Sequence, residues 1–136
     1  MGKYKNPKIL DKENILAVSV ALQSVIIQHC DYKEVLKYAQ KSDFIYFDPP
    51  YYPLNDTAYF TSYTQDNFLE KEHIELFETF KTLSNKGCFV LESNSDTDFI
   101  NNLYKKFTIE KIFANRAINS NRNKRGKITE VLIRNY

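Results

Sequence analysis

Glycine, cysteine and tryptophan are scarce in this sequence. Its 136 residues include 3 glycines, 2 cysteines and no tryptophan. Cys30 and Cys88 both lie in apolar runs, where a reduced thiol packs as a small hydrophobic side chain. We therefore expect a protein of the reducing cytoplasm with no disulfide. The 2 histidines lie far apart in the chain and no Cys-x-x-Cys spacing occurs, so the sequence gives a metal site little support.

Long apolar runs and a strong net charge are missing as well. No stretch approaches the roughly 20 apolar residues of a membrane-spanning helix. Lys3, Asn6 and Lys8 stand where a signal peptide would need an apolar core, so we expect no membrane partner. The formal net charge of +2 neither demands nor excludes a nucleic-acid partner. A chain of this length can form one domain with a single core, and residues 1–136 show no internal repeat or second domain.

Aromatic residues are plentiful, at 15% of the chain, and tyrosines gather near its centre. There the apolar run 44–47 leads into Asp48-Pro49-Pro50-Tyr51. This pattern is typical of a buried strand that opens into a loop. The two prolines fix φ and remove two backbone donors, so the loop is stiff and the carbonyls around it point outward as acceptors.

The residue types at this junction suit the amino group of a flat heterocycle. Such a group can donate hydrogen bonds to the Asp48 carboxylate and to a proline carbonyl while its ring stacks on Tyr51. The alternative is an ordinary strand exit, in which the two prolines only end the strand. The neighbouring segments decide between these interpretations.

Apolar spacing along the chain predicts strands that alternate with helices. Asp11 is a suitable N-cap for the first helix, which we expect to pack on a sheet. Runs of β-branched and aromatic residues predict the strands, and the last two strands form a closing hairpin. The expected fold class is therefore α/β. The expected helices are 12–24, 33–41, 66–85 and 97–106, and the expected strands are 25–32, 44–47, 88–91, 108–114 and 128–135.

Cations crowd the loop between the last two expected strands, residues 115–127. Arginine and lysine among small polar residues suit contact with phosphates, which places DNA without reading its sequence. A solvated hairpin tip explains the same charges. The cations that we assign to DNA binding are Arg116, Arg122, Lys124, Arg125 and Lys127.

Several stretches of the chain resemble a known family. Asp48-Pro49-Pro50-Tyr51 after an apolar strand resembles motif IV of the amino-group DNA methyltransferases, and its flanks resemble the Dam-type adenine methyltransferases. The resemblance covers nearly the whole chain, but it does not cover a whole methyltransferase. The matching stretches are residues 4–9, 43–52, Phe60-Thr61-Ser62-Tyr63, Ser93-Asn94-Ser95, 125–130 and 135–136.

This resemblance implies the C-terminal half of a Rossmann-like methyltransferase fold that uses S-adenosylmethionine and ends in a β-hairpin. It implies site-specific methylation of adenine N6 in double-stranded DNA, with the adenine flipped out of the duplex. The Asp48 carboxylate and the Pro49 carbonyl would hold the amino group and stabilise the charge that develops on it. Pro50 would keep the loop stiff, and Tyr51 would stack on the ring.

The resemblance also assigns residues to the methyl donor and to DNA. Asp31 and Tyr32 would contact the adenine of S-adenosylmethionine, and Asp48 would face the donor as well. A turn aspartate beside a core tyrosine is the alternative for the first two. Phe60 and Tyr63 would lie near the flipped base, or would instead form a packing cluster under the loop.

A complete enzyme of this kind needs a glycine-containing loop after its first strand, because only bare backbone lets the donor approach closely. Gly2, Gly87 and Gly126 cannot form such a loop. We expect a partial catalytic domain without the N-terminal donor-binding motif and most of the target-recognition region. Its sheet would have a gap between the strands that end at Asp31 and Asp48.

Three hypotheses follow from that expected deficit. The chain is one part of a methyltransferase that needs an N-terminal complementing chain, or an inactive truncated remnant, or a non-catalytic nucleic-acid-binding module. Methylation of RNA or of a protein glutamine is a further alternative, since related Pro-Pro-Tyr loops act on planar amides. The aspartate at the first motif position and the Dam-like flanks favour adenine in DNA.

Overall fold

The computed structural model describes residues 10–54, 68–115 and 127–136 of the chain. Internal contacts divide the chain into two units, residues 1–31 and residues 32–136. Within the described residues, no helix has both the length and the apolar character that crossing a bilayer requires.

The first unit contains helix α1 (Lys12–Ala21), which is followed by the 3₁₀ turn η1 (Leu22–Ser24). Asp11 caps the helix, because its Oδ1 accepts a hydrogen bond from the backbone N–H of Asn14 at 3.3 Å. The predicted helix is therefore confirmed over residues 12–21, and residues 22–24 continue it as the 3₁₀ turn. α1 buries none of its residues, so the expected packing of this helix on a sheet is not seen within the unit.

The predicted strand that begins at Val25 is wrong. Val25, Ile26 and Ile27 are 50%, 85% and 76% exposed and have no regular secondary structure. A strand needs a neighbour for its backbone hydrogen bonds, and no strand in the described part of the chain pairs with this run. Cys30 is also exposed, so its predicted place in a buried strand is wrong, whereas Cys88 is buried as expected.

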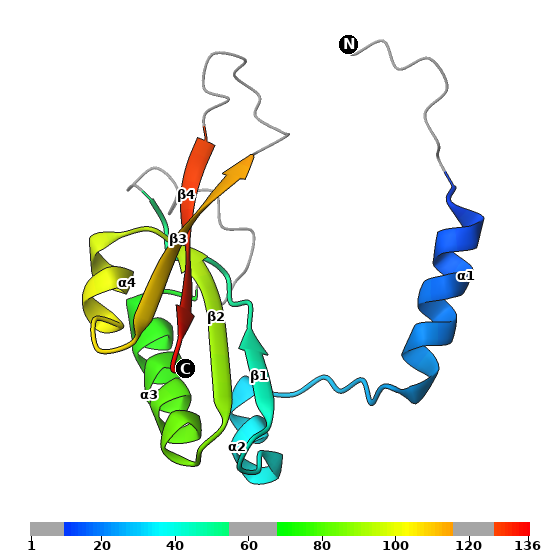
Figure 1. Cartoon of the computed structure of the whole chain (residues 1–136), viewed down its shortest axis with the longest axis horizontal. Helices are drawn as coiled ribbons and strands as arrows, with labels where there is room; N and C mark the ends of the chain where they lie inside the picture. Colours follow the sequence, from blue (N-terminus) through cyan, green and yellow to red (C-terminus); the bar gives the residue numbers. More distant parts are fainter. Residues whose placement is uncertain (1–9, 55–67, 116–126) are drawn as a thin grey trace. The chain divides into compact units, whose positions relative to one another are not determined.

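The second unit is built on a four-stranded sheet with the order β1-β2-β4-β3 (Figure 1). β1 (Phe44–Phe47) runs parallel to β2 (Phe89–Ser95). β4 (Lys127–Arg134) lies antiparallel to both β2 and β3 (Thr108–Asn115). The predicted strand over 44–47 and the closing antiparallel pair are confirmed. β2 differs from the prediction, because it continues beyond Leu91 through the polar residues up to Ser95.

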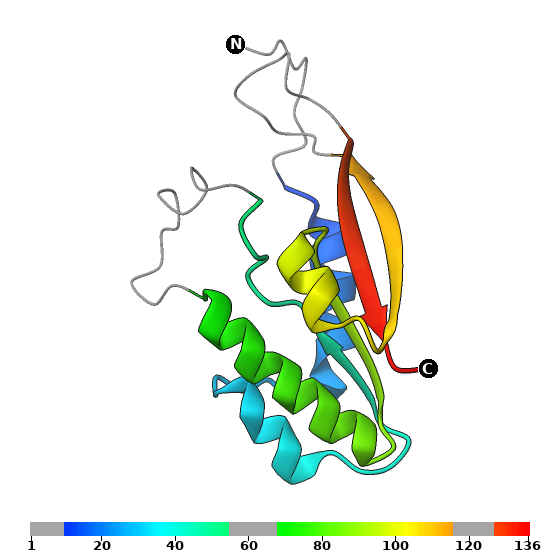
Figure 2. The ribbon, with the colours of Figure 1, turned by 90° about the vertical axis from the view of Figure 1, so that its left-hand side faces the viewer.

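The helices of the second unit lie on one side of the sheet (Figure 2). They are η2 (Tyr32–Glu34) with α2 (Val35–Tyr38), α3 (Glu70–Asn85) and α4 (Asp98–Leu103). α2 and α4 are shorter than the helices predicted over 33–41 and 97–106. Together these helices and the sheet enclose the core, which comprises Phe47, Leu76, Phe80, Leu83, Cys88, Val90, Ile100, Tyr104, Val131 and Ile133.

Local signals explain where α3 begins and ends. The Glu72 carboxylate accepts a hydrogen bond from the backbone N–H of Leu69 at 3.0 Å, which satisfies a donor that the first turn leaves free. Gly87 follows the helix with a φ of +83°, a conformation that glycine adopts without steric cost. The glycine agrees with the predicted end of this helix near residue 85, whereas the helix begins at Glu70 and not at the predicted residue 66.

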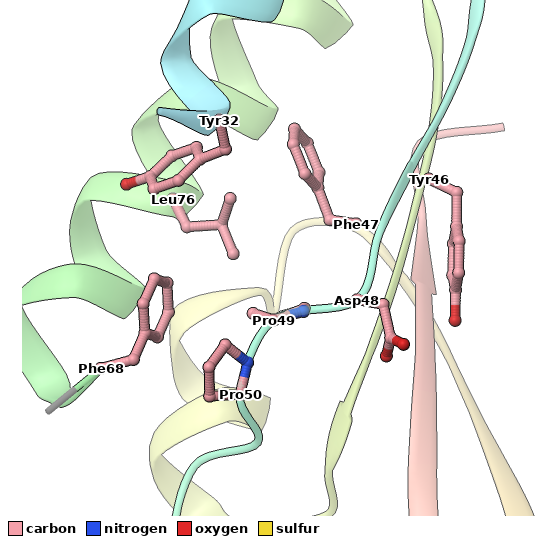
Figure 3. Close-up of a pocket in the computed structure, with 8 residues that line it drawn as sticks. All are labelled: Tyr32, Tyr46, Phe47, Asp48, Pro49, Pro50, Phe68 and Leu76. Atoms are coloured by element: carbon pink, nitrogen blue, oxygen red, sulfur yellow. The ribbon is translucent and has the colours of Figure 1, made fainter. Parts of the chain in front are cut away.

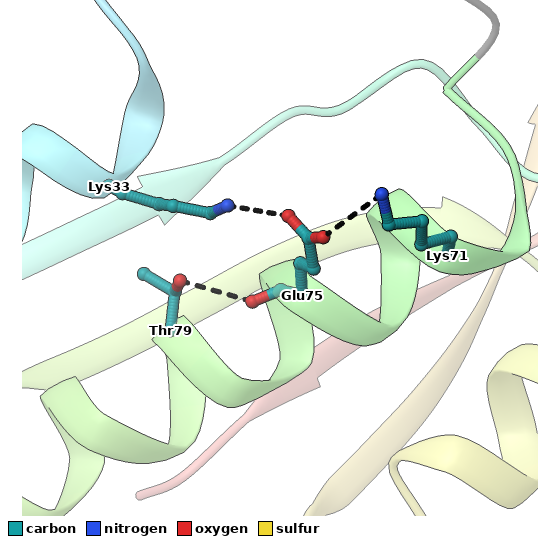
Figure 4. A network of polar contacts seen from close by, with 4 residues as sticks. All are labelled: Lys33, Lys71, Glu75 and Thr79. Atoms are coloured by element: carbon teal, nitrogen blue, oxygen red, sulfur yellow. Dashed lines mark hydrogen bonds and ion pairs between the residues drawn. The ribbon is translucent and has the colours of Figure 1, made fainter.

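A polar cluster on α3 ties the helix to the η2 turn (Figure 4). The Lys33 ammonium forms an ion pair with the Glu75 carboxylate, and Lys71 lies 3.8 Å from the other carboxylate oxygen. The Thr79 hydroxyl donates to the Glu75 carbonyl at 3.1 Å. Pairs this exposed contribute up to about 1 kcal/mol, so the cluster adds only modestly to the contact between the η2 turn and α3.

Candidate active site

The motif at residues 48–51 leaves the carboxyl end of β1. Because β1 and β2 are parallel, the end of β2 lies at the same edge of the sheet, and Phe47 pairs with Glu92. The next residues of the two strands, Asp48 and Ser93, therefore come together. The carboxyl ends of parallel strands are where open α/β sheets commonly place their ligands.

The Asp48 carboxylate is held by a short chain of hydrogen bonds. The Ser93 hydroxyl donates to Asp48 Oδ1 at 2.8 Å, and the Tyr46 hydroxyl donates to Ser93 Oγ at 2.9 Å. Ser93 has a single hydroxyl proton, so donation to Asp48 makes it the acceptor for Tyr46. No donor among the described residues contacts Asp48 Oδ2. The carboxylate is thus oriented through one oxygen and presents the other as an acceptor.

Tyr51 lies beside this carboxylate. Burial raises the pKa of the Tyr51 phenol, a hydrogen bond with Ser93 opposes that rise, and the negative charges of Glu130 and Asp48 add to it. The phenol therefore stays neutral at physiological pH. The buried Ser93 hydroxyl thus lies close to both Asp48 and Tyr51, two residues that the sequence assigns to the site.

A pocket of about 190 Å³ lies next to the motif (Figure 3). Phe47 points to the side of β1 that faces Tyr32 and Leu76, whereas Tyr46 and Asp48 point to the opposite side. This alternation is the normal geometry of a strand. The pocket is lined by Tyr32, Tyr46, Phe47, Asp48, Pro49, Pro50, Phe68 and Leu76.

The chemistry of the pocket suits a planar, mostly apolar group. Aromatic rings, prolines and a leucine supply its walls, and Asp48 is the one charged residue among the described residues that line it. Tyr32 meets Phe47 and Phe68 edge to face, with ring centroids 6.4 and 6.3 Å apart. In the part of the chain that the structure describes, no group of three or more His, Cys, Asp and Glu residues could hold a metal ion.

The loop after the motif is fixed by the end of β2. The backbone N–H of Tyr52 donates to Asn94 Oδ1 at 3.1 Å, and the Tyr52 carbonyl accepts from Ser95 Oγ at 2.6 Å. The Tyr52 ring stacks on Phe99 with centroids 4.5 Å apart. Sequence reasoning noted Ser93-Asn94-Ser95 only as part of a resemblance and gave it no role. Its position directly after an apolar strand parallel to β1 is the signal that could have assigned one.

The structure brings together some of the residues assigned from sequence and leaves others apart. Asp48, Pro49, Pro50 and Tyr32 line one pocket, with Tyr51 beside Asp48. Asp31 is exposed and belongs to the first unit. The remaining assigned residues fall outside what the structure describes, except that Lys127 begins β4 without a described side chain; they are Phe60, Tyr63, Arg116, Arg122, Lys124 and Arg125.

An α/β unit with an aspartate oriented at the carboxyl end of a parallel strand fits a methyltransferase fold, and comparison with known sequences identifies the family. Residues 1–118 match the D12 class of N6 adenine-specific DNA methyltransferases. This match covers most of the chain. The chain therefore belongs to this family.

Curated relatives agree with this assignment. A type II methyltransferase of Lactococcus lactis subsp. cremoris is 47% identical over 99% of this chain and 48% of its own length. A type II methyltransferase of Methanocaldococcus jannaschii is 44% identical over 99% of this chain and 47% of its own length. A DNA adenine methylase of Vibrio cholerae is 36% identical over 96% of this chain and 47% of its own length. The chain thus spans about half the length of the relatives it matches.

Proposed function

We propose that this chain carries the adenine-binding half of a site-specific DNA methyltransferase that acts on adenine N6. The observation that carries the proposal is the hydrogen-bond chain from Tyr46 through Ser93 to Asp48 Oδ1. This chain of hydrogen bonds fixes a carboxylate at the carboxyl end of β1, and no described donor occupies its Oδ2. Membership in an adenine-specific family supplies the substrate class.

The oriented carboxylate matches what methylation of an amino group requires. Adenine N6 is a poor nucleophile, because its lone pair is delocalised into the ring. If N6 donates one hydrogen bond to Asp48 and one to the Pro49 carbonyl, the nitrogen is drawn towards tetrahedral geometry. The negative carboxylate then stabilises the positive charge that develops on N6. Pro50 keeps the loop stiff, and Tyr51 stacks on the flipped base.

S-adenosylmethionine, the methyl donor that the family implies, supplies an activated methyl group when it is bound. The aromatic pocket beside Asp48 fits a planar ring such as its adenine, and the two donor-binding candidates Tyr32 and Asp48 line that same pocket. Asp31, which precedes Tyr32 in the chain, is the third candidate. The described residues offer this ring a surface, and the glycine loop for the methionine part must come from elsewhere.

The proposed function requires double-stranded DNA as the partner. We assign contacts with the flipped base or its neighbours to Phe60 and Tyr63. The basic residues between β3 and β4 would bind phosphates, which position the duplex without reading its sequence. These basic residues are Arg116, Arg122, Lys124, Arg125 and Lys127.

We also propose that the sheet of the second unit is the C-terminal half of a Rossmann-like methyltransferase sheet. Its closing antiparallel pair supports this, as does the position of β1 at the edge of the four described strands. A complementing chain or segment would pair with β1 and bring the donor-binding loop. Without that complement, we expect an inactive chain or one that only binds nucleic acid.

Methyl transfer to duplex DNA from labelled S-adenosylmethionine tests the proposal. The chain is assayed alone and after co-expression with the N-terminal half of the Lactococcus lactis relative. Asp48→Asn keeps the acceptor for Ser93 but removes the negative charge, so we expect methyl transfer to fall about 100-fold or more. Asp98→Asn, on the exposed first turn of α4, is the matched control and should leave the rate unchanged.

The outcomes separate the hypotheses. Equal rates for the wild type and Asp48→Asn would refute the role of Asp48. Salt-sensitive DNA binding with no methyl transfer, alone or complemented, would favour a non-catalytic nucleic-acid-binding module. The absence of both activities would favour an inactive remnant.

A further inference from the structure

The last residues of β2 carry an unusual run of buried polar side chains. Val90 is fully buried among core residues, as expected for a strand covered by helices. Two positions and four positions later, the same face of the strand carries Glu92 and Asn94, both 0% exposed. A buried polar group costs about 1–3 kcal/mol unless it is paired. The partners of these two residues therefore indicate what they do.

Asn94 connects the buried residues to the loop. Its Oδ1 accepts from two backbone N–H groups, that of Tyr52 at 3.1 Å and that of Ser95 at 2.9 Å. Two donors on one oxygen determine the orientation of the amide, since the NH₂ group could not replace that oxygen. Its Nδ2 must then point towards acceptors, and it donates to Glu92 Oε1 at 3.0 Å.

Glu92 is in turn held by Tyr104, the residue that follows helix α4. The Tyr104 hydroxyl donates to Glu92 Oε2 at 2.6 Å, and both residues are fully buried. The second neighbour of the Asn94 amide is His73 on α3, whose Nδ1 lies 3.5 Å from Asn94 Nδ2. The network thus runs from Tyr104 through Glu92 and Asn94 to the backbone of Tyr52. Tyr52 is the residue that directly follows the Asp48–Tyr51 motif.

We propose that Asn94 is a positioning residue for the Asp48–Tyr51 loop: its amide holds the main chain of Tyr52, and the buried Glu92–Tyr104 pair holds that amide. Ser95 completes the clamp, because its hydroxyl donates to the Tyr52 carbonyl at 2.6 Å. Both main-chain polar groups of Tyr52 are therefore held by successive residues of β2. This inference rests on the proposed function only in naming what the loop binds.

The physical effect of such a clamp is to fix both ends of a stiff segment. At one end Ser93 holds the Asp48 side chain, and at the other Asn94 and Ser95 hold Tyr52. The two prolines between them leave little backbone freedom. A substrate amino group that must meet a carboxylate and a carbonyl at once needs this precision, since displacement by about 1 Å can cost about 100-fold in rate.

Amide hydrogen exchange on the full-length chain tests the clamp without any need for catalysis. The measured quantity is the exchange rate of the Tyr52 amide divided by that of the Val131 amide in the sheet core. Asn94→Ala removes the acceptor of the Tyr52 N–H, so we expect this ratio to rise about tenfold or more. Ser95→Ala should raise it as well, because it frees the Tyr52 carbonyl.

Asn135→Ala is the matched control. Asn135 makes the same kind of clamp at the other end of β2, accepting from the Val90 N–H at 2.8 Å and donating to the Cys88 carbonyl at 2.8 Å. Loss of the Asn135 side chain should accelerate amide exchange throughout the second unit. The ratio of the Tyr52 rate to the Val131 rate should stay unchanged. An unchanged ratio in Asn94→Ala, or an equal change in Asn135→Ala, would overturn the proposal.

A conservative pair tests the role of Glu92. In Glu92→Gln the side-chain oxygen can still accept from Asn94, so the ratio should stay near that of the wild type. In Glu92→Leu the Asn94 amide loses that acceptor, and the ratio should rise. If Asn94→Ala fails to fold, Ser95→Ala and Glu92→Leu decide the question, and an unchanged ratio in both would refute the clamp.

The activity assay separates this inference from the proposed function. In the complemented enzyme, Ser95→Ala should lower kcat more than it changes KM, because a loosened loop aligns the base less often. If the complemented enzyme proves inactive while the exchange ratios behave as expected, the proposed function fails and the clamp stands. If methyl transfer is normal in Ser95→Ala and Glu92→Leu, the loop does not need the clamp.

Discussion

At the scale of single residues, two buried ionisable side chains respond to burial in opposite ways. Burial raises the pKa of Glu92 to about 7, which hydrogen bonds from Tyr104 and Asn94 partly oppose. Burial lowers the pKa of His73 to about 4, and the charge of Glu72 opposes that change. His73 Nε2 is also buried without a hydrogen-bond partner among the described residues. Both side chains are therefore most compatible with the fold when neutral.

The free energy of unfolding should depend on pH through both Glu92 and His73. Between pH 4.5 and about 7 the folded chain holds a proton on Glu92 that the unfolded chain releases, so this residue makes stability fall as pH rises. Glu92→Gln removes that loss. We expect the free energy of unfolding of the variant, relative to the wild type, to increase by up to about 3 kcal/mol between pH 4.5 and 8. Urea denaturation at several pH values measures it, and a constant difference would contradict the burial effect.

His73 should act in the reverse direction. Between pH 6.5 and about 4 the unfolded chain binds a proton that the folded chain rejects, so stability is lost as pH falls through this window. His73→Phe removes the titrating group, so its free energy of unfolding relative to the wild type should be larger at pH 4 than at pH 7, by up to about 3 kcal/mol. Where the two windows overlap, the effects of Glu92 and His73 cancel in the wild type. A difference that does not vary with pH would show that His73 can be protonated in the fold.

Some residues of the site can be predicted from the sequence, and others cannot. Asp48 and Tyr51 belong to a contiguous motif, and Tyr32, which the resemblance assigns to the methyl donor, lines the pocket. Ser93, Asn94 and Glu92 have no such motif, because their roles depend on which strand pairs with which. Parallel pairing of β1 with β2 is a contact over more than 40 residues of chain, and a local pattern does not specify it.

At the scale of elements, local apolar patterns predicted the strands that find partners within the second unit. The run at 44–47 and the closing antiparallel pair form as expected. The run that begins at Val25 has an equally strong strand composition, but it does not pair with any described strand. β2 was predicted too short, because Ser93, Asn94 and Ser95 are polar residues that usually signal a loop. Their burial and hydrogen bonds override that preference.

Helix α3 makes the main packing contact with the sheet, so its buried face should carry much of the stability. Phe80 is 0% exposed and meets Tyr104 and Phe107 with ring centroids 5.4 and 4.8 Å apart. We expect Phe80→Ala to lower the free energy of unfolding by about 3–5 kcal/mol. Ile74→Ala, at an exposed position of the same helix, should cost less than about 1 kcal/mol. Similar losses in urea denaturation would mean that the helix does not pack as described.

At the scale of the whole molecule, the sheet has two different edges. β3 closes one edge as the outer strand of an antiparallel pair. β1 forms the other edge, and among the described strands it pairs only with β2. An exposed sheet edge presents unpaired backbone N–H and C=O groups, which can pair with a further strand. The relatives are about twice as long as this chain, so they contain additional residues that could supply one.

Complementation should therefore change the two edges unequally. When the chain is co-expressed with the N-terminal half of the Lactococcus lactis relative and purified as a complex, backbone amides of β1 gain a pairing partner. We expect amide exchange in residues 44–47 to slow about tenfold or more, while residues 108–113 of β3 serve as the internal control and change little. Equal slowing at both edges would indicate general stabilisation of the unit. Unchanged exchange in β1 within a stable complex would show that the partner binds elsewhere, and the proposed continuation of the sheet would then be wrong.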